Sequence, residues 1–176
     1  MKIRDSIMLG VTAGMLAGFP ARFTNTTTYK LGLTDRKYGQ MAASLFLPTK
    51  KQKVHPREAQ IVGFLADYIN CGIIGVLVAN VLAKTGRDRA ILKGVGVAAL
   101  AWMALYGLTT RLKVAPPSRK PLSSILSFGD HVLFGALCGL IADKIGHDSL
   151  FPPQRSKTTG LKPLSQATTP SYSASQ

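Results

Sequence analysis

Apolar residues along this chain collect into four blocks separated by polar, basic segments. A membrane-spanning helix needs roughly 20 largely apolar residues at a rise of about 1.5 Å each. The second and third blocks reach this length alone, whereas the fourth is polar at both ends and the first needs to continue past Pro20 into polar residues. The pattern predicts four transmembrane helices, with approximate spans 6–24, 61–83, 91–110 and 125–145.

The third block, ILKGVGVAALAWMALYGLTT, favours lipid over a soluble core. After Lys93 it has no polar face, whereas a soluble helix shows a charged stripe with a period of 3.6 residues. A helix that is apolar all round belongs in lipid or at the centre of a much larger protein, and a chain of 176 residues is too small for the second. We therefore predict an all-α integral membrane four-helix bundle in preference to a soluble bundle.

The segments outside the blocks complete the expected architecture. The connection 84–93 is short, which predicts an antiparallel hairpin and, with four passes, termini on one side. The island YGQMAASLFLP, residues 38–48, is too short to span; it is either an interfacial helix or a plug packed on the other helices. Residues 1–151 are expected to form one transmembrane domain, and the basic, Ser/Thr/Pro-rich residues 152–176 a disordered tail.

Charge points to the membrane surface as the partner. The net charge of +14 could suggest nucleic acid, but the lysines and arginines flank the apolar blocks, which is the placement for contact with anionic lipid headgroups. No aromatic residues interleave with the basic run KKQK, so we expect no nucleic-acid binding. Four cations lie within the short connection 84–93, which favours a cell-membrane protein with both termini in the cytoplasm.

Glycines recur at helical spacing in the first and fourth blocks. Small residues four positions apart line one face of a helix and let a neighbouring helix approach closely in lipid. We expect this packing role for five glycines, although glycine is common in membrane helices in any case: Gly10, Gly14, Gly18, Gly135 and Gly139.

Two of the acids inside the blocks, Asp67 and Asp130, lie at matching positions. Asp67 is six residues into the second block, roughly 9 Å of helix rise, and Asp130 is five residues into the fourth; a four-pass topology enters both blocks from the same side. Charged groups at such depth normally have partners, and an arginine closes each of the other two helices on that side. We predict one polar cluster near the long first loop, built from Asp67, Asn70, Asp130, His131 and one or both of Arg22 and Arg111.

Such a cluster has three interpretations. It can be interhelical hydrogen bonding that fixes the packing, at about 1 kcal/mol per bond. Both acids can instead lie high enough to reach interfacial water. The cluster can also be a proton or ion relay, in which an acid and a histidine exchange protons. Hydrogen bonding or interfacial placement is preferred to the relay.

Enzyme chemistry finds little support in the motifs. The stretch SFGD, 127–130, is similar to the G-x-G-D signature of intramembrane aspartyl proteases, with Asp67 as a second acid, but Ser127 replaces the first glycine and those proteases have more helices. The histidines and cysteines lack metal-ligand spacing, so no metal and no cofactor are expected. Cys71 and Cys138 lie in apolar blocks and are interpreted as small buried hydrophobic residues.

The chain resembles small four-pass membrane proteins of firmicute-type bacteria that have no assigned activity. The resemblance rests on MKIRDSIMLGVTAGMLAG, AASLFLP, WMALYG and HDSLFP and covers about residues 1–152. It implies a membrane location and brings no functional residue. We predict a non-enzymatic structural or partner-binding membrane component. Its partner would be a second copy of the chain, in a homo-oligomer, or another membrane protein. The alternative is a small ion- or proton-coupled transporter or channel subunit that uses Asp67 and Asp130.

Overall fold

The computed structural model describes residues 2–152 except 36, 48, 112–117 and 119, and within this part the chain is helical. The elements are α1 (Ser6–Lys30), α2 (Tyr38–Ser44), α3 (Thr49–Val54), α4 (Pro56–Thr85), α5 (Ala90–Arg111), α6 (Leu122–Ile145) and a short 3₁₀ helix η1 (Asp148–Leu150). The predicted tail begins at residue 152, and residues 153–176 lie outside the described part.

Four of these helices, α1, α4, α5 and α6, are long and apolar enough to cross a membrane. This confirms the predicted fold class and the four blocks. All four extend past their predicted bounds, α1 and α4 by the most. α1 continues to Lys30, where the Thr28 hydroxyl donates to the Thr24 carbonyl at 3.0 Å and is therefore satisfied within the helix. α4 begins at Pro56, since proline at the first helical position loses no hydrogen bond.

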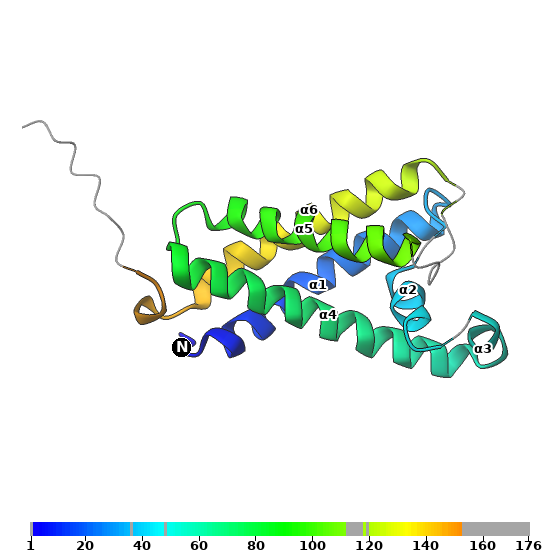
Figure 1. Cartoon of the computed structure of the whole chain (residues 1–176), viewed down its shortest axis with the longest axis horizontal. Helices are drawn as coiled ribbons and strands as arrows, with labels where there is room; N and C mark the ends of the chain where they lie inside the picture. Colours follow the sequence, from blue (N-terminus) through cyan, green and yellow to red (C-terminus); the bar gives the residue numbers. More distant parts are fainter. Residues whose placement is uncertain (1, 36, 48, 112–117, 119, 153–176) are drawn as a thin grey trace, which may run out of the picture.

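The long helices form a bundle in which α1 packs on α4 and α6, and α5 packs mainly on α6 (Figure 1). The short helices α2 and α3 contact α4 at the end of the bundle opposite the N-terminus. At the N-terminal end, the Ile3 amide donates to the Ile145 carbonyl at 2.8 Å and the His147 amide donates to the Ile3 carbonyl at 2.8 Å. The start of α1 and the end of α6 therefore lie together, as the four-pass topology predicted.

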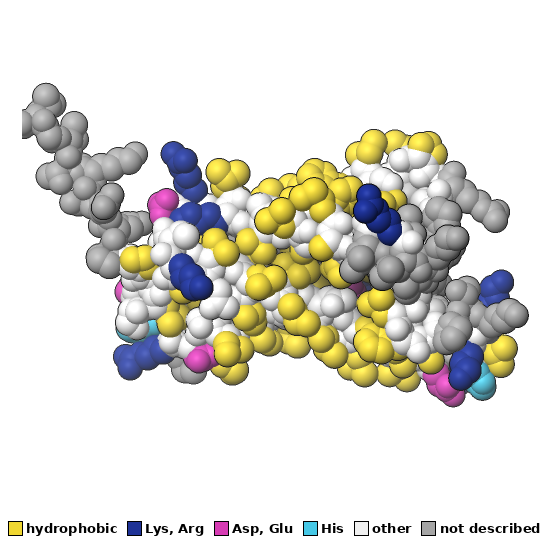
Figure 2. All heavy atoms as spheres, viewed as in Figure 1, with side chains coloured by type: hydrophobic (Ala, Val, Ile, Leu, Met, Phe, Trp, Pro, Cys, Tyr) yellow, Lys and Arg dark blue, Asp and Glu magenta, His cyan; other side chains and the backbone are white. Residues whose placement is uncertain are grey.

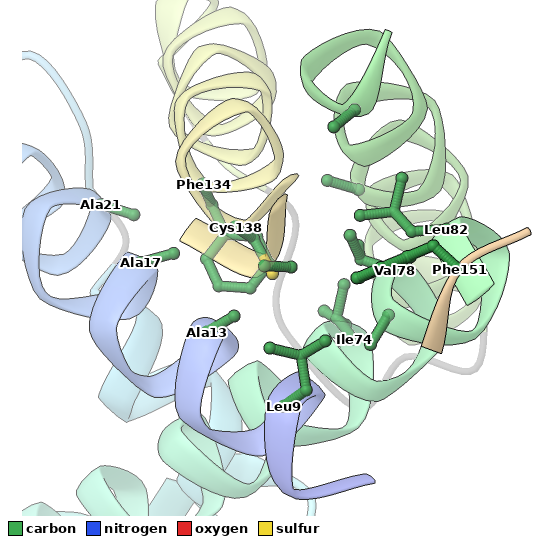
Figure 3. Close-up of a cluster of buried hydrophobic side chains, with 14 residues drawn as sticks. Leu9, Ala13, Ala17, Ala21, Ile74, Val78, Leu82, Phe134, Cys138 and Phe151 are labelled. Carbon is green, nitrogen blue, oxygen red and sulfur yellow. The ribbon is translucent and has the colours of Figure 1, made fainter. Parts of the chain in front are cut away.

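Glycines bring α1 and α4 into backbone contact. A Cβ at Gly14 would overlap the carbonyl oxygen of Cys71, and a Cβ at Gly75 would overlap the carbonyl oxygen of Gly10. Gly18 is less tightly placed, because the nearest atom to its Cβ position is the Cys71 sulfur at 3.0 Å. Ala13 and Ala17 continue this face into the core shared with α4 and α6 (Figure 3).

Glycines also bring α5 and α6 into backbone contact. A Cβ at Gly135 would meet the Ala98 Cβ at 2.7 Å, and one at Gly139 would overlap the Ala90 carbonyl. Gly94 of α5 faces Gly135 in return. These contacts show what the glycine spacing achieves: two pairs of helices meet at backbone distance without a hydrophobic driving force between them.

The face of the molecule shown in Figure 2 is apolar along its middle and charged toward its two ends. Large apolar side chains stand exposed on the outward faces of α4 and α5, among them Ile69, Ile73, Leu100 and Met103. Exposure of these apolar side chains to water would be unfavourable, whereas contact with lipid carries no such free-energy cost. Four apolar helices of this length are consistent with a multi-pass membrane protein.

A group of ionic contacts fastens the terminal end of the bundle. We call Lys2, Arg87, Asp143 and Asp148 the terminal latch. Asp148 accepts from Lys2 at 3.1 Å and from Arg87 at 2.7 Å, and Arg87 also lies 3.6 Å from Asp143. The Arg87 guanidinium donates to the Gly146 carbonyl at 2.6 Å and stacks over Phe151 at 4.2 Å. The latch joins the N-terminus, the α4–α5 turn and the end of α6.

Candidate functional site

A cavity of about 110 Å³ lies between all four long helices and is closed on one side by α2. It is in the half of the bundle nearer the long first loop, where the sequence predicted a polar cluster. Its lining is mostly apolar with a few polar groups, which is the usual make-up of a small-molecule site. The polar lining residues are Arg22, Tyr38, Asp67, Asn70, Trp102, Tyr106, Ser127, Asp130 and His131.

An ion pair between α1 and α4 forms one wall. Arg22 Nη1 donates to Asp67 Oδ2 at 3.0 Å, and the two side chains are 29% and 18% exposed. The guanidinium also lies 4.6 Å from the centre of the Phe64 ring, a cation–π contact. Because a lone charge at this position would be costly, the pair accounts for both residues.

Asp130 on α6 is held differently. It is 8% exposed, and its two oxygens accept from the Thr24 hydroxyl at 2.6 Å and the Tyr38 hydroxyl at 2.8 Å. It makes no ion pair with any residue that the structure describes. Burial, and next the charge of Asp130, raise the pKa of Tyr38, so Tyr38 keeps its proton and remains the donor. One carboxylate therefore links α1, α2 and α6.

The remaining predicted cluster residues divide into those at the cavity and one that is not. His131 lines the cavity; its Nδ1 lies 2.8 Å from the Ser127 carbonyl, which makes Nδ1 the protonated nitrogen. Asn70 also lines the cavity. Arg111 is exposed at the end of α5 and is not among the residues that line it. Of the two arginines, the structure brings Arg22 to the acids.

Aromatic side chains make the wall on the α5 side. The Trp102 and Tyr106 rings stack with centres 5.1 Å apart. The Trp102 indole donates to the Ser127 hydroxyl at 3.2 Å, and the Tyr106 and Ser124 hydroxyls are 2.5 Å apart. On the opposite side, the Tyr38 ring meets the His131 ring edge to face at 5.7 Å.

Sequence reasoning missed three of these groups. Tyr38 begins the apolar island, whose packing against α4 was only one of two alternatives, and Leu45 and Phe46 just after α2 stay exposed, as an interfacial segment would. Thr24 was placed at the end of the first span, without a partner. No role was predicted for Trp102. Tyr38 and Trp102 each offered a signal, because a phenol or an indole in an apolar stretch requires a hydrogen-bond partner when buried.

A larger hollow of about 670 Å³ lies outside α2, between α2, α3 and the first turns of α4. Three residues line both hollows: Arg22, Tyr38 and Met41. These three residues therefore lie between the cavity and the outer hollow. Lys37 and Lys53 make this outer hollow basic.

The arrangement limits the chemistry that the two acids share. Asp67 is paired with Arg22 and Asp130 with two hydroxyl groups, and no hydrogen bond joins the two carboxylates within the described part of the chain. Paired acids that share one proton need direct contact, so the geometry does not favour the aspartyl protease alternative. Among the described residues no group of three potential metal ligands occurs.

Comparison with known proteins found no match for the chain among protein-family models, curated proteins or solved structures.

Proposed function

We propose that this multi-pass membrane protein is a non-enzymatic structural or partner-binding component of the membrane. The observation that carries the proposal is that the cluster contacts cross between helices. Arg22 of α1 bonds to Asp67 of α4, and Asp130 of α6 accepts from Thr24 of α1 and from Tyr38 of α2. Polar bonds of this kind fix the packing of helices that have no hydrophobic reason to associate in lipid.

The surroundings of such a component follow from its surface. Basic residues at both ends support contact with anionic headgroups, and the lightly packed helix α5 leaves an apolar face for a second copy or a membrane protein partner. The proposal includes the cell membrane as location and both termini in the cytoplasm, for which the four cations between Lys84 and Lys93 are the support. It also includes membership of the small four-pass proteins of firmicute-type bacteria.

The cavity supports a second candidate, a small ion- or proton-coupled transporter or channel subunit. Asp130 and His131 both line it, and three residues separate it from the outer hollow. An acid and a histidine beside a cavity are the groups that a proton pathway uses.

Flux measurements separate the two candidates. Wild type, Asp67→Asn and Asp130→Asn are reconstituted in liposomes, with Asp143→Asn at the other end of α6 as the matched control, after equal insertion has been verified. A structural component gives no flux driven by a pH gradient in any sample, and the two cavity variants unfold at lower temperature than the control. Wild-type flux that either cavity substitution abolishes would contradict the first candidate and establish the second.

A further inference from the structure

The fixed charges around the cavity do not cancel. Arg22 and Asp67 neutralise each other as an ion pair, whereas Asp130 meets two hydroxyl donors and no cation within the described part of the chain. Hydroxyl groups stabilise a carboxylate but leave its charge in place. Of the Asp, Glu, Lys and Arg side chains that line the cavity, one is a cation, Arg22, and two are acids, so their formal charges sum to one excess negative charge. Because the surrounding dielectric is low, this charge attracts a cation more strongly than it would in water.

The aromatic wall specifies the kind of cation. Trp102, Tyr106 and Tyr38 line the same cavity as Asp130. Aromatic faces attract cations through their quadrupoles, and a ring of aromatic groups with a carboxylate recognises organic ammonium ions. The contacts between Trp102 and Ser127 and between Tyr106 and Ser124 hold these rings in position without a ligand. A small metal ion would not require aromatic side chains around it.

The volume limits the size of the occupant. An apolar cavity of about 150 Å³ accommodates benzene, so about 110 Å³ accommodates roughly four or five heavy atoms. From charge, wall and volume together, we propose that this cavity is a binding site for a small organic monocation, a protonated or quaternary amine of that size, with Asp130 as its counter-ion. This goes beyond the proposed structural role, which requires no ligand.

Tyr38 and Met41 lie on α2 and line both the cavity and the outer hollow. α2 has only seven residues and packs on α4 through Gly39 and Gly63, whose backbones touch. The helix that closes this side of the cavity is therefore held at backbone distance from α4.

The test uses the one tryptophan of the chain as its reporter, because Trp102 lines the cavity. Full-length protein in lipid nanodiscs is titrated with trimethylammonium while tryptophan fluorescence is recorded at constant pH and ionic strength. The controls are tert-butanol, which is neutral and of similar size, and tetraethylammonium, which is too large. We expect a saturable change with trimethylammonium alone.

Two variants locate the site. Asp130→Asn removes the charge and keeps one acceptor oxygen, which serves either Thr24 or Tyr38, and we expect at least about tenfold weaker binding. Ala42→Leu keeps every charged group and adds three carbon atoms at the cavity wall, and we expect it to abolish binding. Asp143→Asn, outside the cavity, binds as the wild type does. Should Asp130→Asn fail to fold, Ala42→Leu still decides.

The proposal is wrong if the wild type shows no saturable change with trimethylammonium. It is also wrong if tert-butanol acts equally well, because the site is then only apolar. Unchanged binding in folded Asp130→Asn or Ala42→Leu would place the amine elsewhere and overturn the proposal too. A fluorescence response to pH without any response to amine has the same meaning, since the carboxylate then takes a proton alone.

Discussion

At the scale of single residues, Asp67 and Asp130 show how much of the site can be predicted from residue spacing alone. Counting residues from the block ends placed Asp67 and Asp130 at similar depth, and both line one cavity. The choice between Arg22 and Arg111 could not be made from sequence, because it depends on which helices are neighbours. Arg22 lies on α1, which packs on α4, whereas Arg111 lies on α5, which packs mainly on α6.

Removing one partner of the ion pair isolates the other. Arg22→Met leaves the Asp67 carboxylate without a cation in a site only 18% exposed, so we expect the free energy of unfolding in detergent to fall by roughly 3 kcal/mol. The double variant Arg22→Met, Asp67→Asn removes both charges and is expected to recover much of this loss. The measurement is a double-mutant cycle with Asp67→Asn as the fourth corner. Additive losses, without recovery, would show that the two residues do not act as a pair.

At the scale of the helices, small residues determine which surfaces meet. The spacing of Gly10, Gly14 and Gly18 indicated a packing face, and the first two are in backbone contact with α4. What the spacing could not show is the partner, because Gly75 and Gly63 of α4 stand in an apolar helix with no glycine repeat of equal clarity. The docking of α2 was equally hidden, since seven residues are too few to carry a periodic signal.

Substitution of these glycines is expected to be sharply position-dependent. Gly14→Ala places a methyl group into the Cys71 carbonyl and forces α1 from α4, which we expect to cost about 1–3 kcal/mol of stability. Gly96→Ala on α5 is the matched control, because nothing lies within 4 Å of its Cβ position. There the change is neutral or stabilises by roughly 0.5 kcal/mol through helix propensity. Unfolding temperatures of both variants provide the check, and equal losses would contradict the close contact.

At the scale of the whole molecule, the two ends of the bundle are built from different chemistry. The end with the first loop has the cavity, with one ion pair and several hydroxyl donors, whereas the terminal end has the latch of Lys2, Arg87, Asp143 and Asp148. The topology that joins Ile3 to the end of α6 followed from counting passes. The latch itself did not, because Arg87 and Asp148 are 61 residues apart and lie in segments without periodicity.

The latch is expected to weaken in acid. Hydrogen bonds from Lys2 and then Arg87 lower the pKa of Asp148 from its usual 3.8, so the folded state binds this proton less readily than the unfolded state. The stabilisation is therefore complete above about pH 4 and is lost as the pH falls through the lowered value. We expect hydrogen-exchange protection of the Ile3 and His147 amides, corrected for intrinsic rates, to fall in that range.

Two variants control this measurement. Asp148→Asn is expected to show low protection of both amides already at neutral pH, with no further loss in acid. Asp88→Asn removes another carboxyl whose pKa is lowered, in this case by Lys93, but lies outside the latch and should retain the wild-type response. If the pH response disappeared in Asp88→Asn and persisted in Asp148→Asn, the titrating carboxyl would be Asp88, and the prediction for Asp148 would be wrong.

The bond from Tyr38 to Asp130 has a consequence for biogenesis. Its two residues are 92 positions apart, and the ribosome releases them in that order. When α2 emerges, neither its seat on α4 nor its acceptor on α6 has been synthesised. A nascent chain with three inserted helices can therefore seat α2 on α4, but the bond from Tyr38 and the wall made by α6 form only when the last helix arrives.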